Sequence, residues 1–289
     1  MSSKHKELTA QEEWTLVIRP KSGWFDINFR ELWQYRDLVR LFVKRNYSAM
    51  YKQTILGPLW FILSPLLTVL IFTIVFGNIA KIPTDNLPQF LFYMAGNTLW
   101  TYFAYCLNST ASTFTSNAVL FGKVYFPRLT MPLSTVIFGL ISFFIQFVMF
   151  IGFVLYYTAT STSVKPNLYI LITPLLVLMV ALLGLGFGII FSSLTTKYRD
   201  LTILISFGVQ LWMYASPVVY PISGLSEEYK AIVMLNPMSP IIEAFRYAFL
   251  GAGSLSLPYL IYSGFVTLFV LGLGIIIFSR VEKTFIDTV

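Results

Sequence analysis

The sequence has few of the residues that most enzymes use for chemistry. Of its 289 residues, one is cysteine and one is histidine, and only 11% are charged. Cys106 cannot form a disulfide within the chain, and His5 lies in a polar tail that we expect to be disordered, with no metal-ligand cluster in the sequence. No Ser-His-Asp or Cys-His combination can be assembled, and the absence of a G-x-x-x-x-G-K-[ST] loop excludes nucleotide hydrolysis by that route. We therefore expect a chain that is not an enzyme by itself and that holds no metal or cofactor.

Carboxylates are also missing from the long apolar runs. An ion-driven carrier usually needs Asp or Glu inside the membrane to carry protons or sodium, so this class is disfavoured. Glu243 is the nearest candidate, and its spacing of three residues from Arg246 allows an ion pair. We interpret this pair as one that holds a short helix in place rather than as a proton relay. Energy for transport must then come from elsewhere, most simply from a separate ATPase subunit.

What the sequence has instead is a series of long apolar runs, with 56% hydrophobic residues overall. A charge at the centre of a membrane helix costs about 2.5–3.5 kcal/mol, and here the charges cluster between the runs. We predict an all-α membrane protein with six spans, each long enough to cross a hydrocarbon core about 30 Å thick. The expected spans are Leu56–Gly77, Gln89–Ala111, Pro132–Tyr157, Leu168–Leu194, Leu201–Tyr220 and Leu257–Ser279.

Three glycines lie two residues apart in the fourth expected span: Gly184, Gly186 and Gly188. They are a weak look-alike of a dinucleotide-binding fingerprint, but no soluble strand precedes them. We interpret them instead as residues that allow helices to pack closely.

Basic residues predict the orientation of the spans. Ten Lys and Arg precede the first span, and the later loops on that side add Lys123, Arg128, Lys197, Arg199, Arg280 and Lys283. The opposite side holds only Lys81, Lys165, Lys230 and Arg246. The positive-inside rule therefore places both termini in the cytoplasm. The expected domains are a cytoplasmic tail at 1–28, an amphipathic helix at 29–53, a six-span domain at 54–280 and a cytoplasmic tail at 281–289.

An amphipathic helix is predicted before the first span, from Phe29 to Lys52. Its apolar face carries Phe29, Leu32, Tyr35, Val39, Phe42, Val43, Tyr47 and Met50 at helical spacing. The opposite face is polar and mostly basic, with Leu41 as the exception: Arg30, Gln34, Asp37, Lys44, Arg45, Ser48 and Lys52. Such helices lie along a membrane surface with the basic face near anionic head groups. Two interpretations remain open, a simple interfacial anchor and a helix to which a partner docks.

The outer segment 216–251 differs from a plain loop. It holds four prolines and two apolar stretches that are too short to cross a membrane. Stretches of this length suit re-entrant or interfacial half-helices, and non-helical backbone at membrane depth is tolerated only inside protein or beside a water-filled cavity. We expect the outer mouth of a transport pathway here.

Two further features are candidates for a role in transport. The inner loop at 115–132 mixes apolar, aromatic and basic residues, so it is either a short helix that inserts into a soluble partner or interfacial padding. Aromatic residues make up 17% of the chain, and belts at the two membrane interfaces account for most of them. A minority are candidates to line a conduit for sugars: Trp60, Tyr102, Tyr105, Trp212, Tyr214 and Tyr220.

Several separated runs of residues resemble one family. They are ELWQYRDLVRLFVKRNYSAMYKQTILGPLWFILSPLL, KVYFPRLTMPLS, TTKYRDL, SPVVYPIS and LNPMSPIIEAFR. In these runs the chain resembles the permeases of polysaccharide-exporting ABC transporters of the type-two class, which include the O-antigen (Wzm-type), capsule and teichoic-acid export permeases. The resemblance covers nearly the whole chain, from about Gly23 to Arg280, and its motifs fall in order at the expected topological positions.

The resemblance implies a homodimer in the bacterial cytoplasmic (inner) membrane, with two copies of an ABC ATPase subunit that bind ATP and Mg. The implied cargo is a polysaccharide linked to undecaprenyl pyrophosphate, exported from the cytoplasm to the periplasm. O-antigen is the favoured cargo, and the alternatives are capsule, teichoic acid, or a drug or small lipid. Membrane lipids are expected contacts, and nucleic acid is not.

The resemblance also implies roles for individual residues. The interface helix at the ATPase would carry Arg36, Arg40, Lys44 and Arg45. The ATPase-coupling loop would contain Ser116, Asn117, Leu120, Phe121, Lys123, Tyr125 and Arg128. Phosphate favours Arg forks and Lys point charges, so the candidate contacts to the lipid pyrophosphate are Arg40, Arg45, Lys52, Lys123 and Arg128. For each of these five, ordinary positive-inside charge is the competing interpretation.

Overall fold

The computed structural model describes residues 29–52, 55–121, 123–124, 126–161, 163–195, 198 and 200–284, and every regular element in these ranges is a helix. The tail predicted at 1–28 lies outside the described residues, as do residues 285–289 of the predicted C-terminal tail. The helices are α1 (Phe29–Gln34), α2 (Arg36–Tyr51), α3 (Trp60–Phe72), α4 (Gln89–Ala111), α5 (Thr113–Ser116), α6 (Ala118–Phe121), α7 (Thr130–Thr160), α8 (Thr173–Thr195), α9 (Leu201–Tyr214), α10 (Glu227–Leu235), α11 (Met238–Leu250) and α12 (Leu257–Thr284). Short 3-10 turns at Gly57–Leu59, Leu168–Ile172 and Ile222–Gly224 and a π-helical stretch at Thr73–Ile79 complete the described elements.

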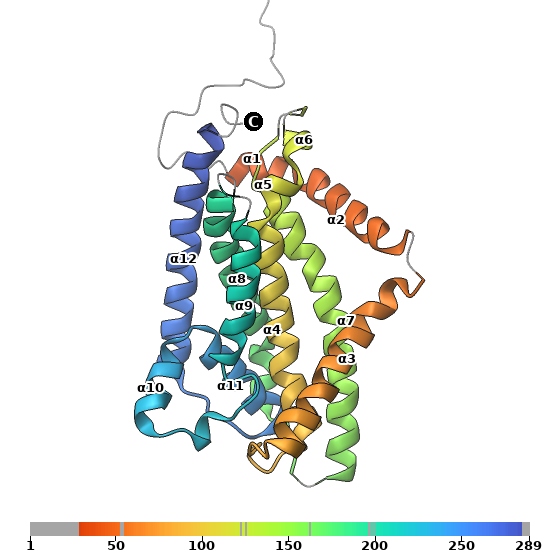
Figure 1. The fold of residues 1–289 in the computed structure, drawn as a ribbon, viewed down its shortest axis with the longest axis vertical. Helices are drawn as coiled ribbons and strands as arrows, with labels where there is room; N and C mark the ends of the chain where they lie inside the picture. Colours follow the sequence, from red (N-terminus) through yellow and green to blue (C-terminus); the bar gives the residue numbers. More distant parts are fainter. Residues whose placement is uncertain are drawn as a thin grey trace, which may run out of the picture.

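The long helices form a bundle that runs along the longest axis of the molecule (Figure 1). The short helices α1, α2, α5 and α6 lie at one end of this bundle, together with the C-terminal end of α12, and we call it the α2 end. Helices α10 and α11 lie at the opposite end, which we call the α11 end. The predicted amphipathic helix and inner loop therefore lie at one end of the bundle, and the predicted outer segment 216–251 contributes the helices at the other end.

Four helical stretches are long and apolar enough to cross a membrane: Gly57–Ile79, Thr130–Thr160, Leu168–Thr195 and Leu257–Ser279. They confirm the first, third, fourth and sixth predicted spans by length and composition. The second predicted span is also a helix, α4, with the predicted bounds. It is less apolar because it lies in the middle of the bundle, where Asn97 and Thr98 are buried among the surrounding helices.

Helix α9 ends at Tyr214 and does not continue to Tyr220 as predicted for the fifth span. Pro217 explains the early end, because its ring disfavours helical backbone at the residue before it, Ser216. The fourteen residues of α9 extend about 21 Å, which is less than the hydrocarbon core of about 30 Å. The segment after α9 leaves the helix while its residues 216–219 are still buried.

The close packing of α8 depends on its glycines. A Cβ atom on Gly184 would lie 2.7 Å from Cβ of Cys106, and one on Gly188 would lie 2.5 Å from Cβ of Thr110, so both glycines bring α8 against α4. A Cβ atom on Gly186 would lie 2.9 Å from the backbone nitrogen of Leu271 in α12. These contacts confirm the interpretation of the three glycines as packing residues.

The predicted amphipathic helix is divided in two. Tyr35, with φ −88° and ψ 15°, separates α1 from α2, so the single helix predicted from Phe29 to Lys52 is wrong in this detail. The predicted apolar face is confirmed in α2, where Val39 and Phe42 are buried and α2 packs against α7. Leu41 is 60% exposed, as its place on the polar face predicts.

Candidate functional site

The first candidate site is at the α2 end, where α2 meets the segment that precedes α7. Nη2 of Arg45 lies 3.4 Å from Oδ1 of Asn117, 72 residues away in the chain. The rings of Phe42 and Phe126 lie 5.6 Å apart, and both belong to a buried cluster with Met131. The predicted interface helix and the predicted coupling loop are therefore one packed unit.

The predicted coupling loop folds on itself through Asn117. The side-chain amide of Asn117 donates a hydrogen bond of 3.0 Å to the backbone carbonyl of Thr113, and the backbone carbonyl of Asn117 accepts hydrogen bonds from the backbone amides of Leu120 and Phe121. The ring of Phe121 stacks on that of Phe126, with 5.5 Å between the centroids. The loop thus forms the two short helices α5 and α6 and packs on α2 through aromatic side chains.

The basic candidates of this end have different surroundings. Arg128 is buried, and its guanidinium lies 5.9 Å from the ring centre of Phe121, while Arg45 lies 5.1 Å from that of Phe42. Lys52 and Lys123 are exposed, as is Ser116 in the loop. Arg40 pairs with Asp37 at 3.1 Å. The structure therefore brings Arg45 and Arg128 to one aromatic cluster, and it does not bring Arg40 there. Tyr125 lies outside the described residues.

The aromatic candidates for a conduit do not share one surface of the single chain. Tyr102 is buried and donates a hydrogen bond of 3.3 Å to the carbonyl of Val136 in α7, and Tyr105 also contacts α7, at Phe138. Trp212 packs between α4 and α8, with its ring 5.2 Å from Phe103 and 5.1 Å from Phe187. Trp60, at the start of α3, and Tyr214, at the end of α9, are 47% and 45% exposed, and Tyr220 is partly buried.

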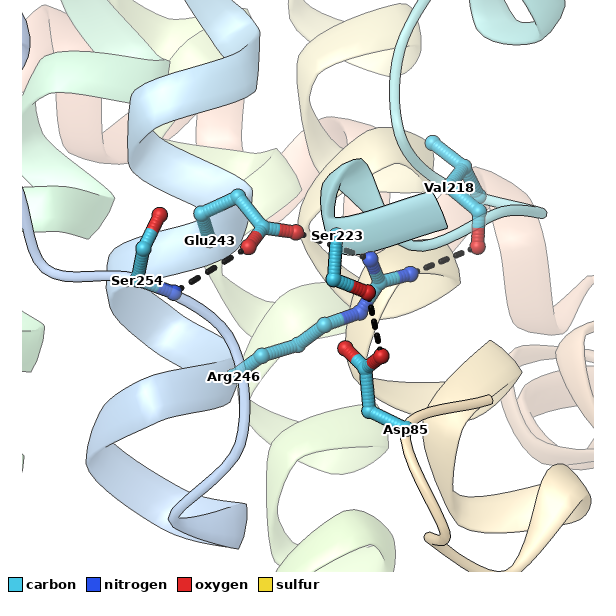
Figure 2. A network of polar contacts seen from close by, with 6 residues as sticks. All are labelled: Asp85, Val218, Ser223, Glu243, Arg246 and Ser254. Atoms are coloured by element: carbon cyan, nitrogen blue, oxygen red, sulfur yellow. Dashed lines mark hydrogen bonds and ion pairs between the residues drawn. The ribbon is translucent and has the colours of Figure 1, made fainter. Parts of the chain in front are cut away.

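The second candidate site is a polar network at the α11 end (Figure 2). Nη1 of Arg246 lies 3.3 Å from Oε1 of Glu243, and the two side chains are 1% and 4% exposed. This confirms the predicted ion pair. Nη2 of Arg246 donates a hydrogen bond of 2.7 Å to the carbonyl of Val218, in the segment after α9, and Oε2 of Glu243 accepts one of 3.3 Å from the amide of Ser254. The pair thus connects α11 with the segments that precede α10 and α12.

At this network, burial and the charge of the partner shift the pKa values of Glu243 and Arg246 in opposite directions. Burial lowers the pKa of Arg246 to about 10, which leaves the guanidinium charged at neutral pH. Its positive charge also lies 3.7 Å from the ring centre of Phe92 in α4, where the electron-rich face of the ring attracts it. Burial raises the pKa of Glu243, and the positive charge of Arg246 opposes this rise.

Sequence patterns did not reveal the other members of the network. Oγ of Ser223 donates a hydrogen bond to Oδ1 of Asp85, and the charge of Asp85 acts on Arg246. Asp85 lies in the turn between α3 and α4, far from Arg246 in the chain, and Figure 2 shows its carboxylate below the guanidinium, with Glu243 to the left and Val218 to the right. The sequence signal here is the turn-forming pair Asp85-Asn86, and in the structure both residues have left-handed backbone, with φ 51° and 62°.

The arrangement at both sites joins helices and offers contacts, and among the described residues no group of three His, Cys, Asp or Glu could hold a metal ion. Both networks consist of side chains that hold separate segments of the chain together.

Comparison with known proteins identifies the family of this chain. Residues 37–250 match the ABC-2 type transporter family. The chain is similar to two proteins of Klebsiella pneumoniae named O-antigen export system permease protein RfbA, with 28% identity over 255 residues and 27% over 252, each covering 87% of this chain and 94% of the relative. It is also 30% identical over 223 residues to the RfbA permease of Myxococcus xanthus, covering 76% of this chain and 83% of that protein. These matches confirm the resemblance to polysaccharide-exporting permeases, and the chain belongs to the ABC-2 type transporter family.

Proposed function

We propose that this chain is the permease half of an ATP-driven exporter that moves a polysaccharide linked to undecaprenyl pyrophosphate from the cytoplasm to the periplasm. O-antigen is the favoured cargo, because the relatives described above are named O-antigen export permeases. The observation that carries the proposal is the docking unit at the α2 end, in which Arg45 meets Asn117 and Phe42 meets Phe126.

In this proposal the energy comes from two copies of a separate ATPase subunit, one for each permease of a homodimer. The docking unit lies at one end of the bundle, the α2 end, with α2 packed against α7 (Figure 1). Because α2 and the coupling loop share buried side chains, a subunit that pushes on one displaces the other. The loop leads directly into α7, so the displacement passes into the bundle.

We propose that α4 crosses the membrane together with the four apolar stretches, and that α9 with the buried residues 216–219 after it completes a sixth span in the bacterial inner membrane. The α2 end then faces the cytoplasm, where the positive-inside rule places basic residues. Helices α10 and α11 become two half-helices at the periplasmic mouth. The Arg246 network supports this placement, because it ties α11 to the segment after α9.

The seam of the proposed dimer is formed by α3 and α9. The rings of Phe76 and Tyr214 lie 6.4 Å apart, so the outer ends of these two helical segments are neighbours. Both segments expose apolar side chains. Ile71 lies in α3, Ile74 lies in the π-helical stretch that continues it, and Ile203 and Phe207 lie on α9. Movement of the docking unit would open a path along this seam, and Trp60 and Tyr214 are the exposed aromatic candidates to line it.

The proposal is tested by deleting the gene and locating the lipid-linked polymer. We expect the polymer to accumulate on the cytoplasmic face of the inner membrane and to disappear from the cell surface. Loss of polymer synthesis would point instead to an enzyme. Normal surface polymer with changed tolerance of small apolar compounds would point to the drug or small-lipid alternative.

A second test addresses the basic residues at the proposed cytoplasmic gate. Replacing Arg40, Arg45, Lys52, Lys123 and Arg128 together with glutamine should reduce export while membrane insertion and dimer assembly persist. Normal export by this variant would refute their assignment to the lipid pyrophosphate.

A further inference from the structure

A groove of about 810 Å³ lies between α2 and the first part of α7. It shares α2 with the docking unit, but none of its lining residues belongs to the coupling loop or to α3 and α9 of the proposed dimer seam. Its wall on α2 includes Val39 and Val43, and its floor on α7 consists of Leu133, Ile137 and Ile141. The groove is therefore apolar inside.

The rim of the groove is basic. Arg36, Arg40 and Lys44 follow one another at intervals of four residues on α2, so they lie one above the other on one face of the helix, and all three line the groove. Arg40 pairs with Asp37. No carboxylate of the described chain lies within ion-pair distance of Arg36 or Lys44. Two positive charges at the rim are thus left for an anion from outside the chain.

The depth of the groove fits one leaflet of a bilayer. Leu133, Ile137 and Ile141 follow one face of α7 over about 12 Å, and half of a hydrocarbon core is about 15 Å thick. Ile141 also lines a second apolar groove of about 860 Å³ between α7 and the segment 170–181, so the apolar surface continues deeper along α7. Trp33 lines the rim with 71% of its surface exposed, and its ring centre lies 5.9 Å from the guanidinium of Arg36. Exposed tryptophan is typical of the head-group level of membranes.

We propose that this groove binds one anionic phospholipid of the surrounding membrane. Its phosphate lies between Arg36 and Lys44, and an acyl chain lies on the floor formed by Leu133, Ile137 and Ile141. Basic pockets beside membrane helices on the cytoplasmic side hold anionic head groups by this combination of charge and apolar contact. The bound lipid fills the space between α2 and α7 and so fixes the angle of the docking unit against the bundle.

A resident phospholipid fits the groove better than two other occupants. A soluble protein would have to cover an apolar floor that belongs to a stretch long and apolar enough to cross a membrane. An exported lipid-linked polymer would have to pass on to a path, and the groove has no lining residue from the proposed seam. The inference requires a membrane around the chain and does not depend on the identity of the cargo.

The test measures lipid binding by native mass spectrometry of the full-length protein in detergent, titrated with phosphatidylglycerol or with zwitterionic phosphatidylcholine. We expect tighter binding of phosphatidylglycerol, and the double variant Arg36→Gln/Lys44→Gln should weaken it about 30-fold. The matched control is Lys81→Gln/Lys165→Gln, which removes two exposed charges outside the groove and should change the affinity less than about threefold. The variant Ile137→Trp, which fills the floor and keeps the rim charges, should also weaken binding.

Three results would overturn the proposal. They are an equal loss in the control variant, equal affinity of the wild type for the two lipids, and a response to the rim substitutions that is seen with undecaprenyl pyrophosphate but not with phosphatidylglycerol. A measurement on folded protein guards against variants that do not fold. The fluorescence of Trp33 is taken as the difference in emission between the wild type and Trp33→Phe. Phosphatidylglycerol with brominated chains should quench this fluorescence more strongly than brominated phosphatidylcholine does. Equal quenching by the two lipids would count against the site.

Discussion

Arg246 donates a hydrogen bond of 2.7 Å from Nη2 to the carbonyl of Val218, 28 residues earlier in the chain. Val218 lies in the buried segment that follows α9, where the backbone is not helical. A buried carbonyl without a partner would cost free energy, so the guanidinium of α11 replaces the helical hydrogen bond that this segment lacks. This contact and the hydrogen bond of 3.4 Å from Nδ2 of Asn236 to the carbonyl of Ala215 satisfy backbone groups where the chain leaves α9 inside the protein.

Replacing Arg246 with methionine should therefore destabilise the protein strongly. The change leaves the buried carboxyl of Glu243 without its partner, and breaking a buried ion pair in this way typically costs about 3–5 kcal/mol. Thermal or denaturant unfolding of the purified protein in detergent measures the loss. Lys230→Met is a matched control, because Lys230 and Glu227 form an ion pair with the same spacing and the same distance of 3.3 Å on the surface. An exposed pair contributes about 0–1 kcal/mol, so comparable losses in the two variants would contradict this account.

The same variant should depend on pH more strongly than the wild type. Burial already raises the pKa of Glu243 above its usual 4.5, and Arg246 opposes this rise. Without Arg246 the pKa rises further, so the window above about pH 4.5 in which the folded state holds a proton that the unfolded state has released becomes wider. The stability of Arg246→Met should then increase as the pH falls through this window. The double variant Glu243→Gln/Arg246→Met should lack this dependence, and a parallel dependence in both variants would exclude Glu243 as its cause.

The attachment of α2 to the coupling loop can be tested at Phe42. Its ring is 4% exposed and lies 5.6 Å from that of Phe126. Phe42→Ala should cost about 3–5 kcal/mol because it leaves a cavity in the cluster, and export should fall with it. Its neighbour Leu41 is 60% exposed, so Leu41→Ala should change the free energy of unfolding by less than about 0.5 kcal/mol. Equal unfolding midpoints for the two variants would show that α2 is not held by this ring.

Two glycine-to-alanine substitutions should have opposite signs. A Cβ atom at Gly188 would lie 2.5 Å from Cβ of Thr110 and 2.9 Å from the carbonyl oxygen of Leu107, whereas nothing lies within 4 Å of one at Gly208 in α9. Overpacking makes Gly188→Ala destabilising by about 1–3 kcal/mol. Gly208→Ala should stabilise α9 by about 0.5–1 kcal/mol, because alanine loses less conformational freedom in a helix. The unfolding midpoints of the two variants should move in opposite directions, and a gain in Gly188→Ala would disprove the close contact of α8 with α4.

Gly251 is a further position where the backbone requires glycine. It ends α11 with φ +74°, and a Cβ atom there would lie 2.7 Å from the carbonyl oxygen of Lys165. Gly251→Ala should cost at least about 1 kcal/mol, from the left-handed backbone alone. The loss is measured by unfolding, with Gly272→Ala in α12 as the control at which nothing lies within 4 Å. Equal midpoints for the two variants would remove the requirement for glycine at this turn.

Local patterns in the sequence were enough to predict the long helices, the buried face of α2 and one ion pair within a helix. Hydropathy over long windows predicted the four apolar stretches, because the cost of a charge in hydrocarbon acts on each segment separately. The period of apolar residues predicted the buried face of α2, since positions four residues apart lie on one side of a helix. The pair of Glu243 and Arg246 was predictable for the same reason.

The contacts between distant segments were decided by the tertiary structure. Arg45 with Asn117, Arg246 with Val218, and the groove between α2 and α7 each join residues that have no local relation in the sequence. The early end of α9 belongs to this group as well, because a buried segment can leave a helix only where another part of the chain supplies hydrogen bonds to its backbone. Such partners are set by how the helices pack, which involves the whole bundle at once, and a pattern of period 3.6 along one segment carries no information about them.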